Sequence, residues 1–129
     1  MKIEHLAIWV ADLERMKIFY EKYFQAKAGE KYHNPKKQFE SYFLSFSDGP
    51  RLELMYRPDI ESVNKNIAQE FIGFAHIAIS VGSKEKVNTL TEELRSNGNE
   101  VIGEPRTTGD GYYESVVLDP EGNRIEITI

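Results

Sequence analysis

The sequence predicts an α+β fold in which two pseudo-symmetric βαβββ modules form a cupped, mixed sheet. The first observation is an internal repeat, because HLAIWVADLERM from His5 matches HIAISVGSKEKV from His76. The second is that YFLSFSDGPRLELM from Tyr42 matches SVVLDPEGNRIEIT from Ser115. The third is that strand-type and helix-type hydrophobic periods follow one another in the same order in both halves.

The repeat places both modules in a single domain that covers residues 1–129, a length typical of one ordinary domain. The first module covers about residues 1–57 and the second about residues 72–129. The segment 58–71 between them is polar and lacks clear periodicity, so it is predicted to be a connector.

The first strand and helix follow from the N-terminal pattern. Residues 2–10 alternate between polar and apolar side chains, as a half-buried strand does. Asp12 then supplies an N-cap oxygen, and the apolar residues after it recur at helical spacing. These residues are Leu13, Met16, Phe19, Tyr20 and Tyr23.

The second module repeats this order. The apolar run from Gly73 to Val81 predicts a strand, and Ser83 is the corresponding N-cap. Asn97-Gly98 predicts where the following helix ends. The apolar stripe of that helix consists of Val87, Leu90 and Leu94.

Each module is predicted to close with a β-hairpin. The sequences SDGP from Ser47 and DPEGN from Asp119 are turn signals, and each lies between two short apolar runs. The segment from Glu30 to Gln38 is polar and without periodicity, so it is predicted to be a loop.

Strand alternation separates the side chains into two faces, because residues two apart share a face. One face is polar. It carries His5 and Glu53 in the first module, and His76 and Glu126 at the equivalent positions of the second. The other face is apolar and is predicted to pack on the helices. It consists of Leu6, Ile8, Val10, Leu52, Leu54, Tyr56, Ile77, Ile79, Val81, Ile125, Ile127 and Ile129.

Each of the four polar residues has an ordinary explanation when it is taken alone. A histidine on a strand is commonly a hydrogen-bonded core residue. Glu53 beside Arg51, like Glu126 beside Arg124, is commonly one half of an ion pair. Two histidines and two glutamates on equivalent strands of both modules favour a metal site instead. If the two polar faces turn toward each other, all four side chains converge on one point.

The composition limits the partners. A net charge of -5 and a pI of about 5.3 argue against nucleic acid and against an anionic membrane surface. The chain has no cysteine, which excludes disulfides, thiolate nucleophiles and cysteine-ligated metal. Charged residues interrupt the N-terminal segment, so neither a signal peptide nor a membrane span is predicted. We expect a cytoplasmic protein that binds a small molecule.

Four segments resemble the vicinal oxygen chelate superfamily, which includes glyoxalase I. They are EHLAIWVADLERMKIFYEKYF, RLELM, FAHIAISV and LDPEGNRIEIT, and the resemblance spans essentially the whole chain. It implies paired βαβββ modules around a cupped site, where a histidine from the first strand and a glutamate from the last strand of each module bind a divalent metal. Carried over to this sequence, the metal ligands are His5, Glu53, His76 and Glu126.

The complete set of four is similar to glyoxalase I, which isomerises the hemithioacetal of methylglyoxal and a thiol through a metal-stabilised enediolate. The resemblance implies a metal-dependent lyase or isomerase in which Glu126 is the base and Glu53 is its partner or a second base. Zn, Ni, Co, Mn and Fe all suit two imidazoles and two carboxylates.

Two positions depart from the bacterial glyoxalases that use glutathione. Those enzymes typically carry an arginine four residues after the first histidine and an asparagine four residues after the first glutamate. This sequence has Trp9 and Arg57 there. Both are predicted to bind substrate, Arg57 by holding a carboxylate and Trp9 by covering an apolar group or forming a pocket wall, with poor use of glutathione.

Other functions stay open within the same superfamily. Its thiol transferases and its extradiol-type dioxygenases use two histidines and one glutamate, which His5, His76 and Glu126 would satisfy. A metal-free protein that binds a drug in the cup is the third possibility. The resemblance also implies a homodimer, with sites either within or between the chains.

Overall fold

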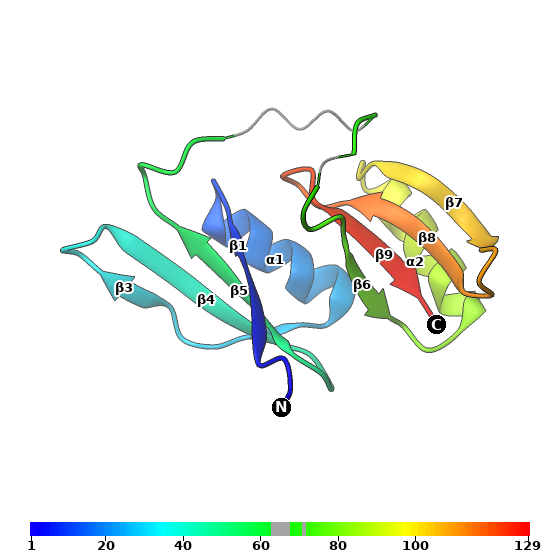
Figure 1. Cartoon of the computed structure of the whole chain (residues 1–129), viewed down its shortest axis with the longest axis horizontal. Helices are drawn as coiled ribbons and strands as arrows, with labels where there is room; N and C mark the ends of the chain where they lie inside the picture. Colours follow the sequence, from blue (N-terminus) through cyan, green and yellow to red (C-terminus); the bar gives the residue numbers. More distant parts are fainter. Residues whose placement is uncertain (63–67, 71) are drawn as a thin grey trace. The chain divides into compact units, whose positions relative to one another are not determined.

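The computed structural model describes residues 1–62, 68–70 and 72–129 (Figure 1). By its contacts the chain divides into two compact units, Met1–Asn64 (unit 1) and Lys65–Ile129 (unit 2). In its described residues each unit has one helix and one mixed sheet, which confirms the predicted α+β class. None of the helices in the described residues is both long enough and apolar enough to span a bilayer.

Unit 1 contains a sheet with the order β1-β5-β4-β2, and β3 pairs with β4 outside this path. β1 runs parallel to β5, and the other pairs are antiparallel. Its elements are β1 (His5–Trp9), α1 (Leu13–Phe24), β2 (Lys27–Ala28), β3 (Tyr32–Asn34), β4 (Phe39–Ser45) and β5 (Arg51–Tyr56).

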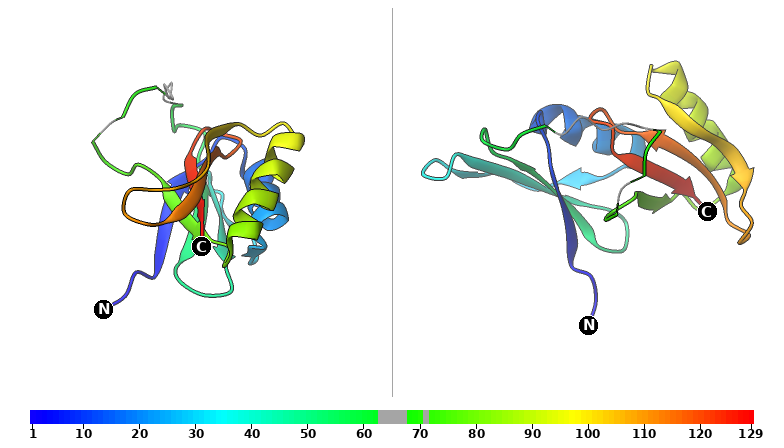
Figure 2. Two further views of the ribbon diagram at one scale, coloured as in Figure 1. Left: turned by 90° about the vertical axis from the view of Figure 1, so that its right-hand side faces the viewer. Right: turned by 45° about the horizontal axis from the view of Figure 1, so that its top comes forward.

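Unit 2 has the order β6-β9-β8-β7, with β6 parallel to β9, so it repeats the plan of unit 1. Helix α2 lies along one face of this sheet, as both views in Figure 2 show. The elements are β6 (Ile77–Ser80), α2 (Lys84–Ser96), β7 (Val101–Thr107), β8 (Tyr113–Leu118) and β9 (Arg124–Thr128).

The segment from Glu30 to Gln38 is not only a loop, and this part of the prediction was wrong. It contains β3, which forms a short antiparallel hairpin with the start of β4. Strand pairing overrides the polar composition here, because the backbone of Tyr32 to Asn34 bonds to β4 whatever its side chains. Unit 1 therefore has one strand more than a βαβββ module.

The helix boundaries follow the predicted capping signals. The Asp12 carboxylate accepts a hydrogen bond from the backbone N–H of Arg15 at 2.9 Å, and the Ser83 hydroxyl accepts one from that of Lys86 at 3.2 Å. Helix α2 ends at Ser96, and Gly98 has a φ of 81°, a left-handed conformation that favours glycine.

The apolar faces predicted from alternation pack toward the helices on β5 and β9, whereas Leu6, Ile8, Ile77 and Ile79 on β1 and β6 are only half-buried. In unit 1 the helix residues Leu13, Met16, Phe19, Tyr20 and Phe24 and the strand residues Leu44, Leu52 and Leu54 are buried. In unit 2 the buried set includes Val87, Leu94, Val117, Ile125 and Ile127. The buried helix residues also differ from the prediction in detail. In α2, Thr91 is buried and Leu90 only half-buried. Phe24 is buried where Tyr23 is only half-buried, and Ile129 is exposed because it lies beyond the end of β9.

Candidate functional site

In unit 1, His5 and Glu53 meet on the polar face of the sheet. The parallel register places His5 opposite Arg51 and Ala7 opposite Glu53. The imidazole Nε2 of His5 lies 3.7 Å from Oε2 of Glu53. The Glu53 side chain is 14% exposed and that of His5 is 38% exposed, so the pair is sheltered but reachable from solvent.

Unit 2 brings together the equivalent pair. Ala78 lies opposite Glu126 in the parallel register of β6 and β9, as Ala7 lies opposite Glu53 in unit 1. His76 Nε2 lies 3.1 Å from Glu126 Oε2, with side chains that are 40% and 21% exposed. The repeat in the sequence is therefore a repeat of side-chain geometry as well.

The neighbouring arginines do not take the two glutamates as ion-pair partners within the described residues. Arg51 instead donates through Nε to Glu4 Oε1 at 2.9 Å. Arg124 donates through Nη1 to Glu70 Oε2 at 2.7 Å. The ordinary explanation of Glu53 and Glu126, an ion pair with the arginine two positions earlier on the same strand, is not what the structure shows.

The surroundings of His5 include residues that the sequence pattern did not single out. Nδ1 of His5 lies 2.5 Å from Glu4 Oε2, and the ring packs edge-on against Phe43 with centroids 5.2 Å apart. The Arg51 guanidinium lies 4.1 Å from the centroid of the same Phe43 ring. Hydrogen bonds from His5 and Arg51 lower the pKa of the Glu4 carboxyl.

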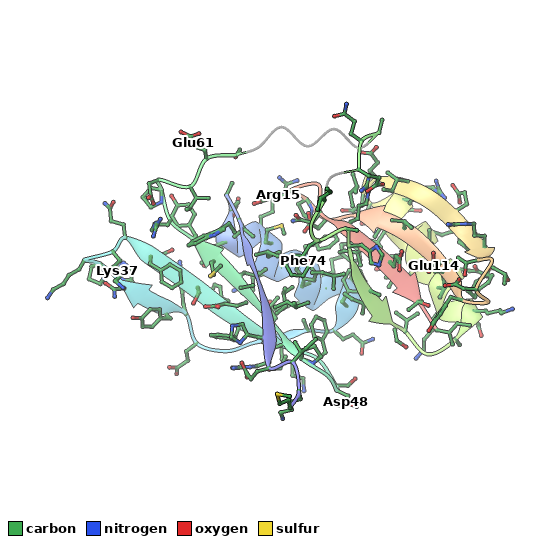
Figure 3. All side chains as sticks on the ribbon, viewed as in Figure 1. Arg15, Lys37, Asp48, Glu61, Phe74 and Glu114 are labelled. Carbon is green, nitrogen blue, oxygen red and sulfur yellow. The ribbon has the colours of Figure 1, made fainter. Side chains whose placement is uncertain are left out.

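The polar face of unit 2 contains an open cavity of about 690 Å³. His76 and Glu126 line it, together with Arg106 from β7. Arg106 Nη2 is 3.8 Å from Oε1 of Glu114, the β8 residue labelled in Figure 3, so most of its N–H donors stay available to a ligand. A Cβ at Gly103 would come within 3.1 Å of the Val116 side chain, so glycine lets β7 approach β8 beside the cavity.

Trp9 and Arg57 lie together at the other end of the unit 1 face. The Arg57 guanidinium is 5.5 Å from the Trp9 ring centroid, and its Nε donates to Asp59 at 2.5 Å. That hydrogen bond lowers the pKa of the Asp59 carboxyl. Trp9 also packs edge-on against Phe39, and it remains 42% exposed. This end of the face is therefore an aromatic surface beside the Arg57 guanidinium.

The donor set of the two pairs fits a divalent metal ion. Each unit contributes one imidazole nitrogen and one carboxylate, the ligand types that borderline transition metals accept. Within the described residues no group of three or more His, Cys, Asp or Glu side chains is arranged to hold a metal.

A sequence model of the Glyoxalase/Bleomycin resistance protein/Dioxygenase superfamily matches residues 2–127. The chain belongs to this superfamily. The family and the fold class predicted from the motifs are therefore confirmed.

Curated relatives of this superfamily member include two bacterial enzymes named lactoylglutathione lyase. The chain is 29% identical to the one from Salmonella typhimurium over 133 residues, covering 98% of this chain and 91% of the relative. It is 28% identical to the one from Haemophilus influenzae over 130 residues, covering 98% and 90%. The chain is thus a glyoxalase-like member of the superfamily.

Solved structures of the superfamily show the same fold. The trypanothione-dependent glyoxalase I of Leishmania major superposes with a TM-score of 0.78 at 27% identity, covering 99% of this chain and 86% of that one. Maize glyoxalase I gives 0.79 at 25% identity, and the match covers 98% of this chain but only 44% of the maize chain. A possible glyoxalase from Bacillus cereus gives 0.73 at 27% identity, covering 100% and 99%.

Proposed function

We propose that the protein is a metal-dependent glyoxalase I-type enzyme that isomerises the thiol hemithioacetal of an α-oxoaldehyde. The observation that carries this proposal is the repeated pair, in which His5 faces Glu53 and His76 faces Glu126, with Glu53 opposite Ala7 and Glu126 opposite Ala78 in the two parallel registers. All four side chains are partly exposed, so a substrate can reach them. Proteins named lactoylglutathione lyase among its relatives support the same reaction class.

In this proposal His5, Glu53, His76 and Glu126 hold one divalent ion, which is Zn, Ni, Co, Mn or Fe. When bound, such an ion acts as a Lewis acid that stabilises negative charge developing on the substrate oxygens. Nε2 of each histidine faces its glutamate, so the donor atoms of each pair are already directed at a common point.

The chain's own part in the chemistry is to move a proton. The hemithioacetal becomes a thioester when a proton leaves the carbon that bears sulfur and hydroxyl and returns to the neighbouring carbonyl carbon, while the hydroxyl proton passes to the former carbonyl oxygen. Glu126 is our candidate for the base because its carboxylate lines the unit 2 cavity, whereas Glu53 is more enclosed. Glu53 would act as its partner or as a second base.

We assign substrate binding to Trp9 and Arg57. The exposed Trp9 ring offers a flat apolar surface, and Arg57 beside it can receive a carboxylate only in competition with Asp59. These contacts suit a thiol with an apolar part better than the strongly polar glutathione.

The assembly proposed for this enzyme is a homodimer. β1 lies at one end of its sheet and β6 at one end of the other, and open edges of small sheets are commonly closed by pairing. The sites would then form at a subunit interface, with one His-Glu pair from each chain.

Metal analysis of protein purified without chelator tests the proposal. We expect one divalent ion per chain, and we expect His76→Ala or Glu126→Ala to weaken binding by about 100-fold or more because a ligand is lost. His33→Ala is the matched control, because His33 lies on β3, exposed and outside the set. Unchanged metal affinity in both His76→Ala and Glu126→Ala would rule out the proposed metal site.

Assays of metal-loaded protein separate the alternatives within the superfamily. Methylglyoxal is supplied with several thiols, and a catechol is supplied with iron and oxygen. Thioester formation supports the proposed isomerase. Oxygen consumption with the catechol, and no thioester with any thiol, would favour a dioxygenase. Tight binding of a drug without any turnover or metal would favour a sequestering protein.

A further inference from the structure

The two histidines occupy equivalent positions but are held differently. Nδ1 of His5 lies 2.5 Å from the Glu4 carboxylate, while Nε2 faces Glu53 at 3.7 Å. An ionised carboxylate only accepts hydrogen bonds, so the ring proton of a neutral His5 belongs on Nδ1. Nε2 then carries a lone pair and faces the lone pairs of Glu53, an arrangement that suits a bound cation.

Glu4 has a 55% exposed side chain, and two contacts to Arg51 orient it toward the histidine. Its Oε1 accepts from Arg51 Nε at 2.9 Å, which leaves Oε2 for the histidine. Its backbone carbonyl accepts from the Arg51 backbone N–H at 3.1 Å, which ties residue 4 to the start of β5. Arg51 is itself packed over the Phe43 ring. The carboxylate is thus held through its side chain and its backbone.

The described part of unit 2 shows no equivalent carboxylate beside His76. The residue before His76 is Ala75, which has no carboxylate, and Arg124 at the place of Arg51 pairs with Glu70. Among the described residues no carboxylate lies within ion-pair distance of His76 Nδ1. Nε2 of His76 lies 3.1 Å from Glu126 Oε2.

We propose that Glu4 is a positioning residue that keeps the proton of His5 on Nδ1 and so turns the Nε2 lone pair toward Glu53. Its role in metal binding rests on the function proposed above, but its effect on the histidine does not. His5 is then ready to coordinate as it stands. Carboxylates that hold the second nitrogen of a metal-binding histidine commonly contribute 10–100-fold to affinity.

Nitrogen-15 NMR of the metal-free protein at a pH where the imidazoles are neutral tests the effect on His5. We expect the His5 proton on Nδ1 in the wild type and a shift toward Nε2 in Glu4→Ala. Glu4→Gln should keep the proton on Nδ1, because the amide oxygen can still accept it. Glu70→Gln is the matched control, because it breaks the equivalent arginine pair without touching a histidine. A proton on Nε2 of His5 in the wild type, or no difference between wild type and Glu4→Ala, would overturn the inference.

Zinc titration of the same variants tests the consequence. We expect Glu4→Ala to weaken binding by about 10–100-fold, Glu4→Gln to weaken it less, and Glu70→Gln to leave it unchanged. Equal zinc affinity in Glu4→Ala and wild type would contradict the assigned role in metal binding. If the tautomer shifts as expected but the wild type binds no metal, the proposed function fails and the assignment of Glu4 to His5 stands. If the wild type binds metal but the His5 tautomer does not depend on Glu4, the proposed function stands and the assignment of Glu4 to His5 fails.

Discussion

Thr91 and Ser115 form a buried hydroxyl chain between α2 and β8, and its direction can be assigned from two distances. Thr91 Oγ1 lies 2.6 Å from the carbonyl oxygen of Val87 and 2.7 Å from Ser115 Oγ. A hydroxyl has one proton and a carbonyl only accepts, so Thr91 donates to Val87 and Ser115 donates to Thr91. Both side chains are 0% exposed, so solvent cannot replace either partner.

Thr91→Val keeps nearly the same shape but removes the acceptor of Ser115. A buried donor without its partner costs about 1–3 kcal/mol of unfolding free energy. Ser115→Ala leaves the bond from Thr91 to Val87 in place and removes only an accepted bond, so its cost is about 1 kcal/mol. The double variant should lose little more unfolding free energy than Thr91→Val alone, because the Ser115 hydroxyl that Thr91→Val leaves without an acceptor is absent. The predicted coupling is about 1 kcal/mol.

Urea unfolding followed by circular dichroism measures these free energies. Thr89→Val is the matched control, because Thr89 is an exposed residue of the same helix and its hydroxyl bonds the Lys86 carbonyl at 3.3 Å. Its change should stay within about 0.5 kcal/mol. If Ser115→Ala costs more than Thr91→Val, or if the two effects simply add, the assigned direction of the chain is wrong.

Three further predictions concern the site. If the sites lie between subunits, a mixture of His5→Ala and His76→Ala chains should regain activity that neither variant has alone. No recovery on mixing, or a monomer in sedimentation, would count against the dimer. Arg106→Gln should raise KM about 10-fold for thiol adducts that carry a carboxylate, without changing kcat or the KM for neutral adducts. If KM changes equally for both classes of adduct, Arg106 does not contact the carboxylate. Trp9→Ala should raise KM severalfold for adducts of apolar thiols but not for the adduct of a small polar thiol, which is the control. An equal rise in KM for both kinds of thiol would mean that Trp9 forms a pocket wall without specificity.

The fold was predictable from the sequence because local signals agree with the tertiary arrangement. The alternation of the strands places His5 and Glu53 on one face, and the structure finds them 3.7 Å apart although they are far apart in the chain. The caps at Asp12 and Ser83 are local signals of the same kind. Strand β3 has no such signal, because its pairing with β4 depends on backbone bonds in a polar segment.

Several site residues could not be predicted because their partners are set by packing. Glu4 precedes β1, and its bond to Arg51 depends on the parallel pairing of β1 with β5. Phe43 contacts His5 only because β4 lies beside β5 in a particular register. Arg106 lies next to a register shift in β7, where simple alternation no longer says which face a residue occupies.

The most direct test of the proposed function compares turnover in metal-loaded wild type and Glu126→Gln. Methylglyoxal and a panel of thiols are supplied in deuterated water, and deuterium is followed at the carbon that receives the proton. Glutamine keeps the shape of the side chain but cannot accept a proton, so turnover should fall by about 10²-fold or more. Glu92→Gln, on an exposed position of α2, should react like wild type. Equal rates in wild type and Glu126→Gln would contradict the account.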